Sequence, residues 1–309
     1  MTKFKIWLEA ARLRTLPLSL SGIIFGSAIA YNDNIFNGKI FFLALLATLC
    51  FQVLSNFAND LGDTLKGADN EHRVGPMRAV QSGGISIAEM KVGVVITSVI
   101  SLIVAALLIW VSSEGKGFSF WLFYLILAVL CIAAAILYTI GKKAYGYNGL
   151  GDVFVFIFFG LVSVVGVYHL YPESISLATF NWSLFLPATT IGAFSMAVLN
   201  LNNMRDRESD EKSGKNTLAV RLGFRKAKVY HSYIVLVGIS SFILYLIFFV
   251  HNGFASFLFL LPILLFHFHL KDMWKVQQGK DFDPFLKKVA LSTFLLSCLF
   301  FIVSLIQHV

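Results

Sequence analysis

Asn56-Phe-Ala-Asn-Asp-Leu-Gly-Asp63 closes one long apolar run of the sequence, and Asn202-Asn-Met-Arg-Asp-Arg-Glu-Ser-Asp210 closes another. In each stretch an Asn precedes an Asp by four residues, and a second Asp follows three or four residues later. On a helix this spacing places the three side chains on one face. Because carboxylates beside hydrocarbon are costly, such placement usually marks a functional site. The two stretches therefore predict two helix ends that face one another.

The rest of the chain has the composition of a membrane protein. Its 309 residues are 57% hydrophobic and only 14% charged, whereas soluble domains carry about 25% charged residues. Apolar segments long enough to cross about 30 Å of hydrocarbon recur along the whole sequence. They predict one all-α transmembrane domain over residues 1–309, a bundle of about nine helices at 15–31, 40–59, 89–111, 120–140, 151–171, 183–203, 230–250, 254–270 and 287–307.

The basic residues predict the orientation of this bundle. Of the 25 Lys and Arg residues, all but Lys39 and Lys116 fall on one side of the nine predicted crossings. This asymmetry predicts a cytoplasmic N-terminus and cytoplasmic polar loops in a plasma (inner) membrane. The net charge of +8 needs no nucleic-acid partner, because basic loops over an anionic leaflet explain it.

Paired carboxylates at two facing helix ends suit a divalent cation. Mg²⁺ prefers oxygen ligands and is commonly held by one or two carboxylates together with substrate phosphates. The sequence therefore predicts that magnesium and a diphosphate bind between the two ends, with the metal held by Asp60, Asp63, Asp206 and Asp210. Lys and Arg in the adjoining loops would neutralise the remaining phosphate charge.

An apolar bundle with an acidic mouth suits the transfer of an allylic lipid chain. Loss of a metal-bound diphosphate leaves a carbocation, which a desolvated aromatic face stabilises by about 2 kcal/mol. A dry cavity would also keep water from quenching that cation.

Four other residues each allow two interpretations. Asp152 begins the fifth segment and either caps that helix or orients or deprotonates an acceptor hydroxyl. Arg14 heads the first segment and either anchors it at the interface or receives a carboxylate. Lys142 and Lys143 either anchor the fourth segment or contact the diphosphate.

These motifs resemble those of the UbiA superfamily of intramembrane prenyltransferases. That family carries Asn-Asp-x-x-Asp-x-x-x-Asp after its second helix and Asp-x-x-x-Asp after its sixth. Asn59, Asp60 and Asp63 match the first motif, whose fourth position falls on Gly67 with Asp69 two residues later. The stretches 206–210 and 214–223 match the second motif and its continuation.

Within the superfamily the chain is most similar to the branch that prenylates 1,4-dihydroxy-2-naphthoate in menaquinone biosynthesis, through residues 12–17, 56–69, 75–84 and 147–154. The resemblance implies transfer from a polyprenyl diphosphate in a lipid bilayer, with release of diphosphate and carbon dioxide. It implies that Asp152 orients or deprotonates the acceptor and that Arg14 binds its carboxylate. The resemblance also implies that the metal ligands or the diphosphate are oriented by Asn56, Asn59 and Asn202. The leaving diphosphate would be attracted by the positive charges of Lys66, Arg78 and Lys215.

Three alternatives remain open at this point. A sister prenyltransferase would use 4-hydroxybenzoate, homogentisate or a porphyrin as the acceptor. A phospho-alcohol transferase would need a nucleotide donor. A cation transporter is disfavoured, because transporter sites lie near the bilayer midplane and these acids lie at the ends of the predicted helices.

Overall fold

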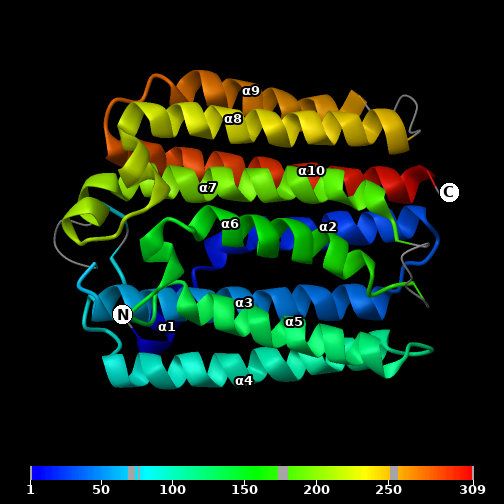
Figure 1. The fold of residues 1–309 in the computed structure, drawn as a ribbon, viewed down its shortest axis with the longest axis horizontal. Helices are drawn as coiled ribbons and strands as arrows, with labels where there is room; N and C mark the ends of the chain where they lie inside the picture. Colours follow the sequence, from blue (N-terminus) through cyan, green and yellow to red (C-terminus); the bar gives the residue numbers. More distant parts are fainter. Residues whose placement is uncertain (1, 69–73, 76, 173–179, 251–256, 308–309) are drawn as a thin grey trace.

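The computed structural model describes residues 2–68, 74–75, 77–172, 180–250 and 257–307 (Figure 1). All regular structure in these residues is helical, which confirms the all-α prediction. The helices are α1 (Lys3–Ala11), α2 (Leu16–Asn32), α3 (Gly38–Leu65), α4 (Ile87–Ser112), α5 (Phe118–Leu137), α6 (Gly151–Val155) with its π-helical continuation η3 (Phe156–Gly166), α7 (Phe185–Lys212), α8 (Leu218–Phe249), α9 (Leu260–Met273) and α10 (Asp283–Gln307).

Each of the nine predicted segments falls on a helix of the described chain. Seven helices are long and apolar enough to cross a membrane, while Gly151–Gly166 and α9 are shorter. Most boundaries differ from the prediction by a few residues, and α3 and α7 continue to Leu65 and Lys212, past the predicted ends at 59 and 203. The fifth segment leaves helical structure just before His169. The helix of the seventh begins at Leu218 instead of 230. It consists of two helical pieces that meet at a sharp bend at Gly223, where φ is 73° and ψ is 167°.

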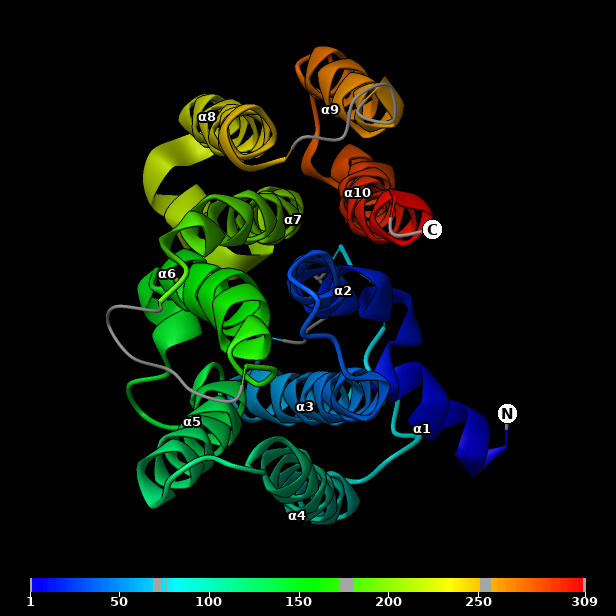
Figure 2. The same ribbon diagram turned by 90° about the vertical axis from the view of Figure 1, so that its right-hand side faces the viewer.

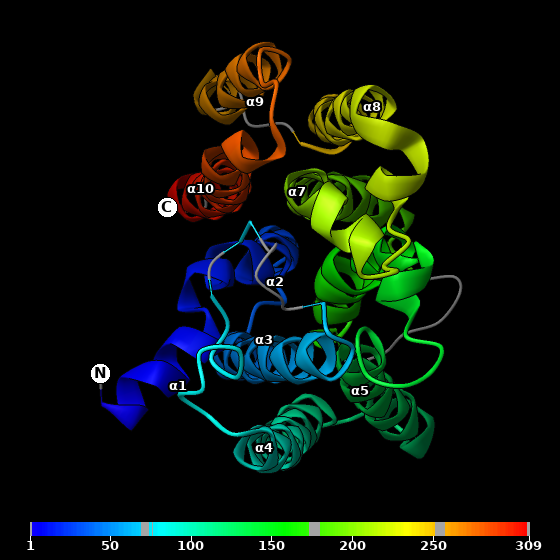
Figure 3. The same cartoon turned by 90° about the vertical axis from the view of Figure 1, so that its left-hand side faces the viewer.

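The long helices run side by side, and the C-terminal ends of α3 and α7 lie at the same end of the bundle, on the left in Figure 1. In the end-on view, α4 lies on one side of the bundle and α8 and α9 lie on the other (Figure 2). The opposite end-on view shows α1 leaving the bundle at an angle beside α3 (Figure 3). The outer faces of α4, α5 and α8 expose many large apolar side chains, as expected for helices that face lipid.

Small residues let the central helices approach closely. A Cβ added at Gly26 of α2 would lie 2.7 Å from the Val164 carbonyl oxygen of η3, and one at Gly160 of η3 would lie 2.7 Å from the Ala188 carbonyl oxygen of α7. Because lipid supplies no hydrophobic drive for helix association, such close contact is a main source of packing energy. It holds η3 against both α2 and α7.

Candidate active site

The tip of α3 carries the first acidic pair. Asp60 and Asp63 are almost completely buried, with 1% and 2% of their surface exposed. Asp60 accepts a hydrogen bond of 3.0 Å from the backbone N–H of Ala79. Asp63 accepts one of 3.3 Å from Arg78 Nη2 and one of 2.8 Å from the Tyr147 hydroxyl. The acids thus collect donors from two loops that are distant in sequence.

The tip of α7 carries the second acidic pair, and Arg205 organises it. The Arg205 guanidinium donates to both carboxylate oxygens of Asp206, at 2.9 and 2.7 Å. It also donates to Asp283 Oδ1 at the start of α10, at 2.6 Å, and to the side-chain oxygen of Asn202, at 2.7 Å. Two-pronged contacts of this kind fix orientation as well as charge, so Arg205 fastens the end of α7 to the start of α10.

Lys215 connects the two acidic pairs. Its Nζ lies 4.0 Å from Asp63 Oδ1 and 3.7 Å from Asp210 Oδ1. The loop that carries it folds back on the end of α7, with the Lys215 N–H bonded to the Asp210 carbonyl oxygen at 2.8 Å. One ammonium group is therefore within reach of a carboxylate from each tip, and the two tips form a single site.

Tyr147 lies buried beside the acids, with its hydroxyl bonded to Asp63. Lys66 Nζ lies 3.9 Å from the centre of its ring and Lys215 Nζ lies 5.3 Å from it. Burial lowers the pKa of Lys66, the charge of Lys215 lowers it further, and the charge of Asp63 opposes both. The tyrosine thus brings two cations close to the acids.

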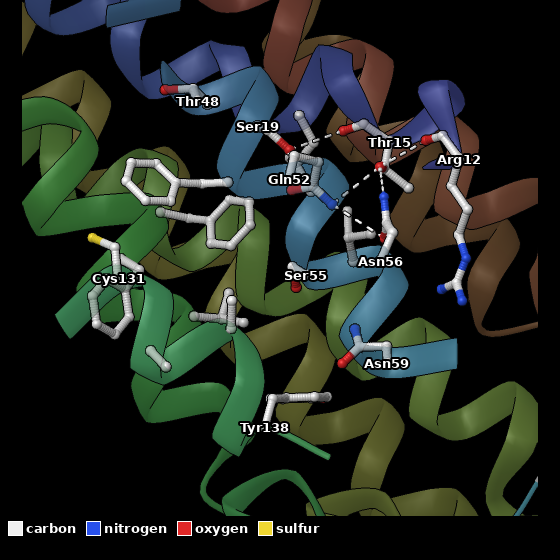
Figure 4. A pocket seen from close by; sticks show the side chains of 18 of the residues that line it. Arg12, Thr15, Ser19, Thr48, Gln52, Ser55, Asn56, Asn59, Cys131 and Tyr138 are labelled. Carbon is white, nitrogen blue, oxygen red and sulfur yellow. Dashed lines mark hydrogen bonds between the residues drawn. The ribbon is translucent and has the colours of Figure 1, made fainter. Parts of the chain in front are cut away.

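A cavity of about 1320 Å³ opens at these tips and continues between the helices. Asp60, Asp63, Arg78 and Lys215 line its mouth. On α3 its lining continues inward to Ala44, about 28 Å from Asp63 at 1.5 Å per residue. Figure 4 shows polar side chains of α3 turned into this space.

Aromatic rings line the cavity beside its mouth. Tyr138, Tyr145, Phe154 and Phe158 contribute to the lining, and the rings of Tyr145 and Phe154 stack with their centres 3.8 Å apart. Their π faces could stabilise a positive charge that develops next to the acids.

The three predicted asparagines and Arg14 all line the cavity. Asn56 donates to the Ala11 carbonyl oxygen at 2.8 Å, which ties α3 to the N-terminal helix. Asn59 accepts from the Thr139 hydroxyl at 3.4 Å. Arg14 is exposed at the rim, where a carboxylate could reach it.

Other predicted residues lie away from the cavity lining. Asp152 is buried and accepts a hydrogen bond of 3.1 Å from the Tyr230 hydroxyl of α8. Lys142 and Lys143 are exposed in the loop after α5. Among the described residues, the cavity lining includes none of these three, and it also leaves out Lys66, Asp206 and Asp210, which lie beside the mouth next to residues that do line it. Asp69 lies outside the described residues.

Three residues of this site were not predicted from the sequence. Arg205 had a usable signal, because an arginine beside an acid at the end of an apolar helix is costly unless paired. Asp283 follows a polar loop and gives no such signal. Tyr147 is one tyrosine among ten, and only the folding of loop 145–148 against loop 213–217 brings it to Asp63.

The donor set fits a hard divalent cation that also binds substrate oxygens. Four carboxylates and three amides provide oxygen atoms, the ligand type that Mg²⁺ prefers. In the described part of the chain, no three His, Cys, Asp or Glu side chains are grouped closely enough to hold a metal by themselves. A bound cation would therefore need further oxygens, and the position of the Lys215 ammonium shows that the site accommodates positive charge between the two tips.

Known proteins resemble this chain over most of its length. The sequence model of the UbiA prenyltransferase family matches residues 19–304. A Haemophilus influenzae protein named 1,4-dihydroxy-2-naphthoate octaprenyltransferase is 43% identical over 96% of this chain and 95% of its own length. An Escherichia coli protein of the same name is 40% identical over 82% and 80%. The solved apo structure of a UbiA homologue from Aeropyrum pernix shares the fold, with a TM-score of 0.67 at 17% identity over 96% of this chain and 99% of that one.

Proposed function

The chain belongs to the UbiA prenyltransferase family, and from this membership we propose that it prenylates 1,4-dihydroxy-2-naphthoate in menaquinone biosynthesis. The donor is a polyprenyl diphosphate, and diphosphate and carbon dioxide are released. The names of the relatives support the choice of acceptor. The structural observation that carries the proposal is the meeting of two acidic helix tips, through Lys215, at the mouth of one long apolar cavity.

The diphosphate would bind at the mouth of the cavity. Arg78, Lys215 and Lys66 lie around Asp63 and can turn from the carboxylate to phosphate oxygens, Arg78 by a two-pronged contact. Magnesium, held by Asp60, Asp63, Asp206 and Asp210, would neutralise charge on the leaving diphosphate. Asn59 and Asn202 stand beside these acids and would hold them, or the diphosphate, in place.

The prenyl tail would extend into the cavity from this point. When the allylic C–O bond breaks, the electron pair leaves with the diphosphate, and the positive charge on the allyl group faces Tyr138, Tyr145 and Phe154. A prenyl tail that fills the cavity would keep water away from these rings, and water would otherwise capture the cation.

The acceptor would approach with its carboxylate toward Arg14 at the rim. The electron-rich ring carbon that bears the carboxylate would form the new C–C bond, and when its bond to the carboxylate breaks, carbon dioxide leaves and the electron pair returns to the ring. Asp152 bonds to Tyr230 away from the cavity lining, so a part in this step would require it to act through neighbouring groups.

The orientation in the membrane follows from the charges. The acidic tips and their basic loops would face the cytoplasm of a plasma (inner) membrane, because most Lys and Arg residues belong to that side. Charged diphosphate would then enter and leave from water, and the prenyl tail would remain at bilayer depth.

The decisive experiment is incubation of the purified protein in lipid nanodiscs with a polyprenyl diphosphate, 1,4-dihydroxy-2-naphthoate and magnesium, followed by mass analysis of the product. The expected product has gained the prenyl group and lost the carboxyl group. Parallel incubations with 4-hydroxybenzoate or homogentisate should give no comparable product. Turnover of either in preference to the naphthoate would reassign the acceptor.

A further inference from the structure

Polar side chains continue along α3 far inside the cavity. Beyond the acids, the cavity-facing positions of this helix carry Asn59, Asn56, Ser55, Gln52 and Thr48, at helical spacings of three and four residues. Figure 4 shows them on one side of the cavity. Polar groups at bilayer depth are costly and face a cavity when they have a function.

The wall opposite this polar row is mainly apolar, and its Tyr124 and Ser163 hydroxyls donate to backbone carbonyl oxygens of η3. The cavity-facing positions of α5 and η3 carry mainly aliphatic and aromatic groups, namely Leu127, Ala128, Cys131, Ala134, Phe158, Phe159 and Val162. A polyprenyl tail contains only carbon and hydrogen, so apolar contacts with this wall are the only contacts that it needs. The prenyl tail therefore gives no reason for a polar row on α3.

Most of the polar row is already hydrogen-bonded within the protein. Gln52 accepts from Ser19 at 2.6 Å and donates to the Thr15 hydroxyl at 3.2 Å. Thr48 donates to the Ala44 carbonyl oxygen of its own helix at 2.9 Å. The Gln52 bonds fasten α3 to the start of α2 and hold the wall in shape.

Ser55 differs from its neighbours. Its side chain is half-buried and lines the cavity, and within the described part of the chain its hydroxyl makes no hydrogen bond. A hydroxyl at this depth that lacks a protein partner is available to a ligand. Ser55 precedes Asp60 by five residues, about 7.5 Å along the helix, so a ring bound to it would lie close to an allyl group released at the acids.

We propose that the α2–α3 wall is the subsite for the aromatic acceptor, in which the Ser55 hydroxyl hydrogen-bonds to a ring hydroxyl, while the prenyl tail lies against the α5–η3 wall. This inference rests on the proposed function, since it requires a hydroxylated aromatic acceptor. Ser55 then determines specificity by holding the acceptor ring, and the Gln52 network positions the wall that carries it.

The test measures the KM for each substrate separately. Ser55→Ala should raise the KM for dihydroxynaphthoate about fivefold, the value of one net hydrogen bond, and leave the KM for the prenyl diphosphate within about twofold. Ser98→Ala is the matched control: it removes a serine hydroxyl from α4, outside the cavity lining, and should change neither value. Cys131→Phe places a larger side chain on the opposite wall. It narrows the cavity there and should raise the KM for the prenyl donor alone.

An acceptor analogue identifies the atom that Ser55 contacts. When the ring hydroxyl that meets Ser55 is absent, the wild type and Ser55→Ala should have the same KM, so 1-hydroxy-2-naphthoate and 4-hydroxy-2-naphthoate are compared. An equal KM for dihydroxynaphthoate in the wild type and Ser55→Ala, or an equal rise for both substrates, would overturn the subsite. Absence of any prenylated naphthoate from the wild type would instead refute the proposed function.

Discussion

Replacement of Arg205 by methionine tests whether the end of α7 depends on its guanidinium. Arg205 and Asp206 expose only 5% and 8% of their side chains, and Arg205→Met leaves the Asp206 carboxylate buried without its two-pronged partner. Loss of one member of a buried ion pair costs about 3–5 kcal/mol. Asp283 also loses a partner, but its side chain is 55% exposed and water can replace that contact. At about 2 °C per kcal/mol for a large domain, the apparent unfolding temperature should fall by roughly 6 °C or more.

The assay is thermal unfolding of the purified protein in detergent, followed by intrinsic fluorescence. Arg207→Met is the matched control on the same helix, since Arg207 pairs only with the exposed residues Glu208 and Glu211 in the described structure, and it should cost less than about 1 kcal/mol. The double variant Arg205→Met/Asp206→Leu removes both buried charges and should recover much of the lost stability. A single variant as stable as the Arg207→Met control, or a double variant less stable than Arg205→Met alone, would refute the reasoning.

The remaining predictions concern the metal, Asp152 and the opposite end of the bundle. Asp60→Asn and Asp206→Asn should each lower magnesium-dependent product formation at least about 100-fold in protein that still elutes as a folded species, and near-normal turnover in either would remove that acid from the metal set. EDTA should abolish turnover and added Mg²⁺ should restore it, whereas undiminished turnover in EDTA would contradict a metal requirement. Asp152→Asn should leave the pH–rate profile unchanged, since this carboxylate bonds to Tyr230 away from the cavity, and loss of one limb of the profile would establish it as the base. Burial lowers the pKa of Lys116 to about 8, so the unfolded chain binds more protons above that pH and stability should rise between about pH 8 and 10.5. Lys116→Met should remove this rise in chemical denaturation experiments, the exposed control Lys39→Met should keep it, and identical pH dependence in the wild type and Lys116→Met would contradict the shift.

The sequence predicted what depends on spacing along one helix. The separation of Asp60 and Asp63 placed both on one face of α3, and the apolar segments gave the helices, because hydrocarbon length and composition are local properties. The π-helical geometry of η3 was not predictable in this way. Its sequence is apolar all round, so no period distinguishes a π-helix from an α-helix.

Residues brought together by tertiary packing were harder to predict. Lys142 and Lys143 carry the same charge as Lys215, and only the fold shows that Lys215 reaches the acids while the other two remain exposed. Asp152 begins a helix near the same end of the bundle, yet its side chain bonds to Tyr230 on α8. The position of these residues in the sequence does not show which way their side chains point in the fold.

The position of Lys215 also bears on the sequence in which ligands arrive. A bare divalent ion would have to displace the ammonium from between Asp63 and Asp210, at a cost in repulsion. A magnesium ion that arrives already bound to the prenyl diphosphate brings an anion with it, and the Lys215 ammonium can move to that anion. The resting enzyme should therefore ignore free magnesium and capture the preassembled salt, and calorimetric titration with magnesium alone should release little heat.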